Sequence, residues 1–137
     1  MTNLTDLGVA AIRDGVRAGD FSARDVASAF VEAAEKARGL NAFIVETPEH
    51  ALAAADAADK ARASDELKPL SGVPLGIKDL FATKGVQTTA GSRILDGFEP
   101  VYESTVSANL FEAGAGMIGK LNMDEFAMGS SNEMTGP

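Results

Sequence analysis

Apolar residues recur at helical spacing over the first third of the chain. The spacing predicts a helix over residues 5–18, with Val9, Ile12 and Val16 on one stripe. A second helix is predicted over residues 22–37, where Ser-Ala-Arg-Asp has the form of a capping box with Asp in place of the usual Glu. Each of these helices therefore presents one apolar stripe along its length.

A short strand and an alanine-rich helix are predicted next. The apolar run Ala42–Val45 predicts the strand, and Thr47 with Pro48 supplies a cap and a first-turn proline for the helix. Eight alanines lie between Ala51 and Ala63. Because alanine is the best helix former but buries little area, this helix is expected either to pack closely on something or to stay at the surface. His50, in its first turn, is expected to be solvated.

Short apolar runs alternate with loops and a helix in the second half. After a polar linker at 64–69, Val73–Ile77 and Ala115–Gly119 are predicted as short strands. Between them Ser104 caps a predicted fourth helix, and a short helix is predicted to end at Ala127. Helices that come first and then alternate with strands favour an α/β fold.

Lys78 follows the Val73–Ile77 run directly and precedes Asp79. A Lys is rarely buried unless it is paired or has a function, so this position is unusual. Two interpretations stay open. In one, the ammonium reaches solvent or pairs with Asp79. In the other, burial lowers the pKa of Lys78, so that its neutral amine can act as a general base toward a hydroxyl nucleophile. Asp79 would oppose that pKa shift if it pointed at Lys78.

Composition excludes several classes of function. The net charge of −8, from 20 acidic and 12 basic residues, argues against a broad nucleic-acid or anionic-membrane surface. With no Cys and one His, neither a thiolate site nor a multi-His metal site is expected. No apolar run approaches the ~18 residues of a membrane span, and no secretory signal is visible. A cytoplasmic location, with no cofactor held by this chain, is the expectation.

Three segments carry a resemblance to the amidase signature family. Gly72-Val-Pro-Leu-Gly-Ile-Lys78-Asp79 looks like the lysine motif of that family, and Thr88-Thr-Ala-Gly-Ser92 is similar to the segment that follows it. The third, Gly119-Lys-Leu-Asn-Met-Asp-Glu-Phe-Ala-Met-Gly-Ser-Ser-Asn-Glu133, resembles the same family again. The match runs in order over nearly the whole chain. It is closest to the A subunits of glutamyl-tRNA(Gln) amidotransferases.

This resemblance implies a Ser-cisSer-Lys mechanism, in which the Lys is the base of a middle Ser that relays to a nucleophilic Ser. Lys78 matches the lysine of the family. Neither catalytic serine matches a residue of this chain, because both are expected after Pro137. Gly129, Ser130 and Ser131 match a loop whose backbone binds substrate. The chain by itself is therefore expected to be inactive.

The resemblance also implies what a complete enzyme would do. Such an enzyme hydrolyses glutamine and passes ammonia to a partner subunit, which amidates Glu-tRNA(Gln) in translation. ATP and Mg²⁺ are implied for the complete complex. The implied partners are glutamine and amidotransferase subunits B and C. Contact with tRNA is implied only through the partner subunit, and no contact with a membrane is implied.

The family fold implied is a large mixed sheet within an α/β domain. Residues 1–137 are then the N-terminal part of a single amidase domain, in which 1–63 are helical, 64–69 are a linker and 70–137 begin the sheet core. Strand edges and apolar faces meant for further parts of the domain would stay open.

Two other functions stay open at this point. The chain could come from a free-standing amidase that acts on small amides, although the segment Asn122–Ser131 favours the amidotransferase. It could instead be a non-catalytic module that binds a partner through its alanine-rich helix. If Lys78 is the base, then Lys84 and Lys120, which lie outside the key position of the motif, are expected to tolerate alanine.

Overall fold

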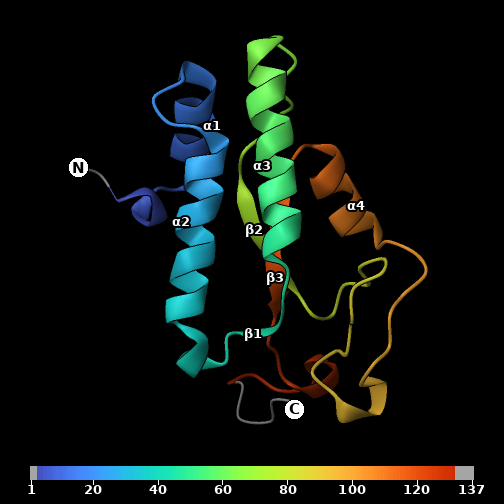
Figure 1. Ribbon diagram of the computed structural model, residues 1–137. Coiled ribbons are helices and arrows are strands. Elements are labelled where there is room, and N and C mark those ends of the chain that lie inside the picture. The colour runs from blue at the N-terminus through green and yellow to red at the C-terminus, as the bar shows by residue number, and fades with distance from the viewer. Residues whose placement is uncertain (1–2, 132–137) are drawn as a thin grey trace.

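The computed structural model describes residues 3–131, in which helices pack on a small mixed sheet (Figure 1). The helices are α1 (Val9–Ala18), α2 (Ala23–Lys36), α3 (Pro48–Ala63) and α4 (Thr105–Glu112), and the strands are β1 (Phe43–Glu46), β2 (Pro74–Lys78) and β3 (Gly116–Leu121). Short 3₁₀ turns lie at Leu4–Asp6, Arg38–Leu40, Arg93–Leu95 and Glu125–Ala127. The predicted α/β class is confirmed, and each predicted helix and strand lies within a few residues of its expected place.

The sheet has the strand order β1-β3-β2, so β3 is central. β1 runs antiparallel to β3, with Phe43 opposite Leu121, and therefore joins the sheet from within the region predicted to be helical. β2 runs parallel to β3, with Ile77 opposite Lys120 and Lys78 opposite Leu121. The two parallel strands consequently end side by side, and the segments that follow them emerge at the same end of the sheet.

The apolar stripes of the first two helices meet α3 in one core. Figure 1 shows α1 and α2 beside α3, which lies in front of the sheet. The buried residues of this core are Ile12, Val16, Ala23, Val26, Ala27, Ala55, Ala58 and Val73. The helical spacing read from the sequence therefore predicts the burial of Ile12 and Val16 correctly, whereas Val9, predicted on the same stripe, is 51% exposed.

The alanines of α3 allow this helix to lie close to β3. Ala51, Ala55 and Ala58 are buried. At Gly116 of β3, an added Cβ would lie 3.0 Å from the Cβ of Ala54 and 3.1 Å from the Cα of Ala51. There is no free space for a side chain at that crossing. Of the two alternatives for the alanine-rich helix, close packing is thus the correct one.

The start of α2 is capped from two directions. Ser22 and Asp25 form the predicted capping box, each side chain accepting from the backbone N–H of the other residue. Asp59 of α3 adds a second cap, because its carboxylate accepts from Ala23 N at 2.8 Å and from Arg24 N at 3.0 Å. A negative charge there also interacts favourably with the positive end of the helix dipole. Asp59 thereby joins α3 to α2 through polar contacts.

The prediction that His50 is solvated is wrong. Its ring is half-buried, with its centroid 4.7 Å from that of Phe111, and its Nδ1 accepts a hydrogen bond from Met117 N at 2.9 Å. Burial lowers the pKa of His50, and the weaker attraction of Glu103 acts in the opposite direction. A neutral imidazole is required, because only an unprotonated ring nitrogen can accept. His50 therefore links α3 to the backbone of β3.

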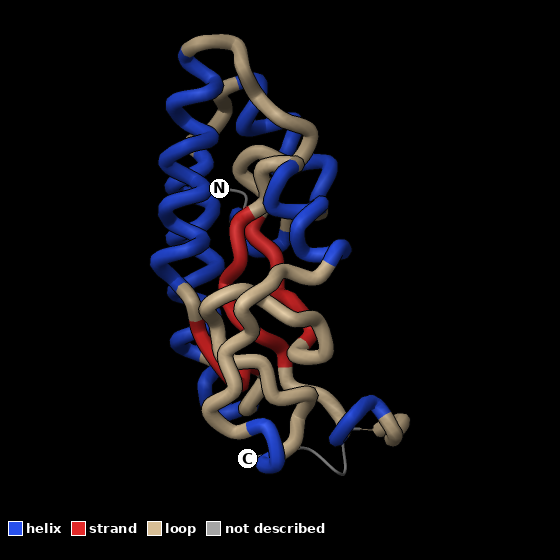
Figure 2. The backbone as a smooth tube through the Cα atoms, turned by 90° about the vertical axis from the view of Figure 1, so that its right-hand side faces the viewer, coloured by secondary structure: helices blue, strands red, loops and turns tan. Residues whose placement is uncertain are grey.

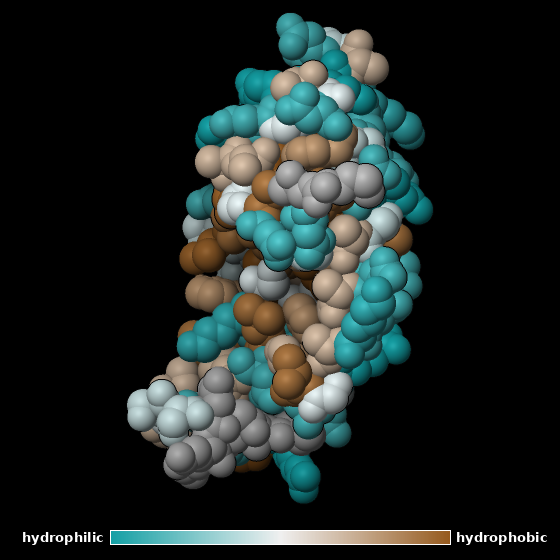
Figure 3. Space-filling model, turned by 90° about the vertical axis from the view of Figure 1, so that its left-hand side faces the viewer, coloured by the Kyte–Doolittle hydropathy of each residue, from teal (hydrophilic) through white to brown (hydrophobic). Residues whose placement is uncertain are grey.

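Some large apolar side chains remain on the surface. The most exposed are Leu40, Ile94, Val101 and Met128. Figure 3 shows separate apolar patches that interrupt the hydrophilic surface on one face of the molecule. Within residues 3–131, no helix is both long and apolar enough to cross a membrane.

Candidate active site

Two loops meet where the parallel strands β2 and β3 end. One follows β2 over residues 79–92, the other follows β3 over 122–131, and Figure 2 shows loops gathered at this end of the strands. Phe126 N donates to Ala90 O at 2.8 Å, and Ser92 Oγ donates to Glu125 Oε1 at 2.6 Å. Ligands of open α/β sheets commonly bind outside the carboxyl ends of the strands. This end of the sheet is therefore the candidate site.

Lys78 is exposed at the last position of β2, whereas Ile77 before it and Asp79 after it are buried. Side chains of a strand point alternately to its two faces. Lys78 thus points away from Asp79, and the interpretation that pairs these two residues is wrong. The burial assumed by the general-base interpretation is also absent from the described part of the chain, where the Lys78 side chain is open to solvent.

The buried lysine of this region is Lys120. Lys120 and Asp79 are both 0% exposed, and Lys120 Nζ lies 3.4 Å from Asp79 Oδ1. The same ammonium donates to Phe81 O at 2.7 Å and to Thr88 Oγ1 at 2.8 Å. Burial lowers the pKa of Lys120, and the Asp79 carboxylate opposes that shift. The expectation that Lys120 tolerates alanine does not fit this arrangement, because the change would leave a buried carboxylate without its counter-charge.

Asp79 also holds the loop that follows it. Its Oδ2 accepts from Thr89 N at 2.8 Å and from Thr89 Oγ1 at 2.5 Å, and its backbone carbonyl accepts from Ala90 N at 3.1 Å. Its Oδ1 has no hydrogen-bond partner among residues 3–131 and faces Lys120. One carboxylate therefore connects the end of β2, the central strand and the Thr88–Ser92 segment.

Both loops contain backbone in the left-handed region. Ala90 and Gly91 have φ values of 51° and 68°, and Phe126 and Ala127 have 51° and 58°. Such values are uncommon for residues other than glycine and cluster at ligand sites, where the surrounding structure holds them. At Gly91 an added Cβ would lie 2.6 Å from Met123 O, so glycine is needed at that contact. The two loops are held against each other in a specific and uncommon conformation.

The three predicted substrate-binding residues, Gly129, Ser130 and Ser131, are exposed and follow the last 3₁₀ turn. An added Cβ at Gly129 would lie 2.5 Å from Asp124 Cγ, so this glycine sits directly against a buried carboxylate. No hydrogen bond among the described residues joins Lys78 to these three. The structure therefore places them in the loop that follows β3, at the sheet end where Lys78 lies.

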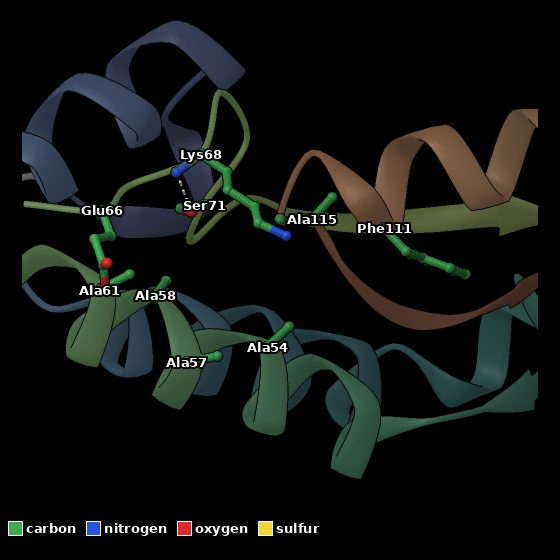
Figure 4. A pocket seen from close by; sticks show the side chains of 10 residues that line it. Ala54, Ala57, Ala58, Ala61, Glu66, Lys68, Ser71, Phe111 and Ala115 are labelled. Carbon is green, nitrogen blue, oxygen red and sulfur yellow. Dashed lines mark hydrogen bonds between the residues drawn. The ribbon is translucent and has the colours of Figure 1, made fainter.

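A groove of about 190 Å³ lies elsewhere, between α3 and the segments 66–71 and 111–115. In Figure 4, alanines of α3 line one side of it and Lys68, Ser71 and Phe111 lie across from them. Ser71 Oγ accepts from Lys68 N at 3.0 Å. None of the predicted site residues lines this groove, so we do not place the active site there. In the described ranges, no three His, Asp or Glu side chains lie together as a metal site would require.

The importance of Lys120 could have been read from the sequence. It follows the apolar run Ala115–Gly119 directly, as Lys78 follows Val73–Ile77. A lysine next to a buried strand was the signal that singled out Lys78, and it applies equally to Lys120. What the sequence could not provide was the partner, because Asp79 follows a different strand, β2, and is 41 positions away along the chain.

Comparison with known proteins establishes the family. The family model described as Amidase matches residues 25–137, and the chain therefore belongs to the Amidase family. The A subunit of the glutamyl-tRNA(Gln) amidotransferase of Rhizorhabdus wittichii is 70% identical over 133 residues, which are 97% of this chain and 27% of that protein. The protein of the same name from Zymomonas mobilis is 65% identical over the same shares. The chain thus spans 27% of the length of these curated relatives.

Solved structures agree with this assignment. The native peptide amidase of Stenotrophomonas maltophilia has a TM-score of 0.80 and 29% identity, covering 88% of this chain and 26% of that one. A structure described as a vestigial protein complex, which bears on the origins of an s-triazine catabolic enzyme, has a TM-score of 0.87 and 40% identity. That likeness covers 96% of this chain and 30% of the other. The resemblance read from the sequence is confirmed at the level of family and fold.

Proposed function

We propose that this chain is part of the A subunit of a glutamyl-tRNA(Gln) amidotransferase, and that Lys78 is the base of its glutaminase site. The observation that carries the proposal is the 70% identity with such a subunit over 97% of the chain. The position of Lys78 supports its role. It stands at the carboxyl end of a parallel strand, and no ion pair among the described residues engages its ammonium.

The proposed reaction starts at Lys78. We propose that further parts of the amidase domain bury Lys78, as its role as a base requires. Its neutral amine would then take a proton from a middle serine, which in turn takes the proton of the nucleophilic serine as that oxygen attacks the side-chain amide carbon of glutamine. The C–N bond then breaks, the proton returns to the leaving nitrogen, and ammonia departs. Water hydrolyses the acyl-enzyme to glutamate. In this proposal both serines belong to a part of the domain outside residues 1–137, and Lys78 would act on them only in the complete domain.

The other partners belong to the same proposal. Ammonia would pass to a partner subunit that amidates Glu-tRNA(Gln), within a cytoplasmic complex that contains subunits B and C. The net charge of −8 supports contact with tRNA through the partner rather than through this chain. ATP and Mg²⁺ would be held by that partner subunit, as the family resemblance implies.

The test uses a complete protein in which residues 1–137 replace the matching segment of the Rhizorhabdus wittichii relative, assembled with the other subunits of that organism. We call it the complete chimera. In it, Lys78→Ala should lower glutamine-dependent ammonia release by about 10²–10⁴-fold, as expected for a general base. Lys78→Arg should fail as well, because guanidinium stays protonated. Lys84→Ala, at an exposed lysine of the loop that follows Lys78, is the matched control.

Two outcomes would contradict the proposal. A folded Lys78→Ala chimera with near-normal turnover would remove the role of Lys78. Glutamine hydrolysis by the purified 137-residue chain would show that this chain already holds a nucleophile. The likeness to a peptide amidase keeps a free-standing amidase as the second candidate. A chimera that hydrolyses simple aliphatic amides faster than glutamine would favour that second function.

The substrate loop provides an independent test. If Gly129 and Ser130 present backbone groups to the substrate, Ser130→Ala should have a milder effect on KM than Gly129→Val. The structure adds a reason, since any side chain at Gly129 would meet the carboxyl group of Asp124. Steady-state kinetics of both variants of the complete chimera would measure this. Equal or reversed effects would assign the contact to the Ser130 hydroxyl instead.

A further inference from the structure

Lys120 holds one loop at three separate points. Its ammonium lies 3.4 Å from the Asp79 carboxylate and donates to Phe81 O at 2.7 Å and Thr88 Oγ1 at 2.8 Å. These groups belong to the start, the first turn and the far side of the 79–92 loop. All three N–H groups of the ammonium therefore have an acceptor or a counter-charge, and all of them face the segment that follows Lys78.

The contacts continue from Lys120 toward the second loop of the site. Asp79 accepts from the backbone N–H and the hydroxyl of Thr89, and Thr89 Oγ1 accepts from Gly91 N at 3.2 Å. The neighbouring Ala90 O then accepts from Phe126 N at 2.8 Å. A continuous chain of polar contacts thus runs from the central strand to the loop that carries the proposed substrate-binding residues.

Stability alone does not account for a charged pair at this place. Removing two charges from water is costly, and replacing a buried ion pair with apolar residues of similar volume is often neutral or stabilising. Lys120 and Asp79 are both 0% exposed, so forming this pair removes both charges from contact with water. An ammonium that makes several hydrogen bonds fixes the position of each loop segment that it binds, because hydrogen bonds are directional. An apolar residue cannot do this.

We propose that Lys120, acting through Asp79 and Thr88, is a positioning residue that fixes Lys78 and the loop after it relative to β3. Asp79 is the immediate neighbour of Lys78, and its backbone N–H donates to Leu121 O at 3.0 Å. The side chain and the backbone of Asp79 are therefore both bound to β3, and Lys78 is held by its neighbour while its own side chain stays free. This inference rests on the proposed role of Lys78 as base.

The experiment compares Lys120→Met with Lys84→Met in the complete chimera. Methionine keeps the length and most of the volume of lysine but removes the charge and the three donors. Lys84 is the control, because it is an exposed lysine of the loop that the Lys120 ammonium binds. The measurements are kcat and KM for glutamine, together with thermal unfolding followed by circular dichroism.

We expect Lys120→Met to lower kcat by about 10²-fold, the scale of a misplaced catalytic group, while KM changes little. Lys84→Met should leave both constants unchanged. The decisive step repeats Lys120→Met in a Lys78→Ala background. If Lys120 acts only through Lys78, Lys120→Met should change the residual turnover of the Lys78→Ala chimera by no more than about twofold. A change of that size is within the deviation from additivity that is usual even for independent sites.

Two results would overturn the proposal. One is a near-normal kcat in a folded Lys120→Met chimera. The other is an equal fractional loss in the presence and absence of Lys78, which would indicate general damage to the fold. If Lys120→Met does not fold, Thr88→Val replaces it, because it removes a single acceptor of the ammonium with almost no change in volume. Its effect on kcat is then compared in the presence and absence of Lys78 in the same way. A fully active Lys78→Ala chimera would instead refute the proposed function, and with it this inference.

Discussion

The helical layer and the loops at the strand ends are stabilised by different interactions. Between α1, α2 and α3 the core is apolar, with Ile12, Val16 and Val26 at its centre. Around the ends of β2 and β3, the fully buried groups include the charged Asp79 and Lys120. The first region is held by the removal of apolar surface from water, and the second by a network of polar groups that satisfy one another.

The difference has consequences for how each region responds to change. An apolar core tolerates substitutions that keep the volume, because the interaction has no direction. A buried polar network does not, because removal of one member leaves another without a partner in a place that water cannot reach. We therefore expect the loops at the strand ends to be the more rigid in conformation and the more sensitive to single substitutions.

The largest effect is expected from Asp79→Ala, which would leave Lys120 buried without its counter-charge. Loss of one partner of a buried pair costs about 3–5 kcal/mol. The matched control is Asp56→Ala, whose partner Arg24 is half-exposed, and here the loss should not exceed about 1 kcal/mol. Amide exchange of peptides from the 79–92 loop and from α3, measured in the complete chimera, reports each local opening free energy. If Asp79→Ala and Asp56→Ala lowered the local opening free energy by similar amounts, the proposed special sensitivity of the loops at the strand ends would be wrong.

A smaller effect is expected from Val26→Ala in the helical core. Val26 is 0% exposed, and loss of two methyl groups there should cost about 1–3 kcal/mol through the cavity that remains. Val101→Ala, at a valine that is 84% exposed, should change stability by less than about 0.5 kcal/mol. In the complete chimera, amide exchange of α2 peptides measures the effect of Val26→Ala, and exchange of peptides that contain residue 101 measures the effect of Val101→Ala. A negligible effect of Val26→Ala would show that the helices can close the cavity.

The smallest effect is a dependence of stability on pH where the start of α3 meets the start of β3. Because burial lowers the pKa of His50, the contribution of its bond to Met117 N is complete above the unfolded pKa of about 6.5. It is lost as the pH falls from there toward the lower folded pKa, by at most about 1.4 kcal/mol per pH unit. Exchange of β3 peptides between pH 7.5 and pH 5.5, corrected for intrinsic rates, measures it. His50→Gln should abolish this dependence, and a dependence that persists in that variant would assign it to another group.

The sequence by itself determined the local features of this protein. The stripes that carry Ile12, Val16 and Val26, the capping box of Ser22 and the strand that ends at Lys78 depend on residues close together in the chain. Such features are set by helical and strand periodicity and by hydrogen bonds over a few residues, so they can be read directly. The motifs around Lys78 and in the segment after β3 were likewise sufficient to indicate the family.

Only the tertiary structure decided which polar groups meet. Asp59 caps a helix that begins 36 residues earlier, and His50 accepts from Met117, which is 67 residues away. The pairing of Asp79 with Lys120 rather than with its neighbour Lys78 depends on the strand order and on which face of β2 each side chain occupies. Composition and spacing do not contain that information. A polar side chain finds its partner only after the sheet has brought distant segments together, and its burial then makes the pairing obligatory.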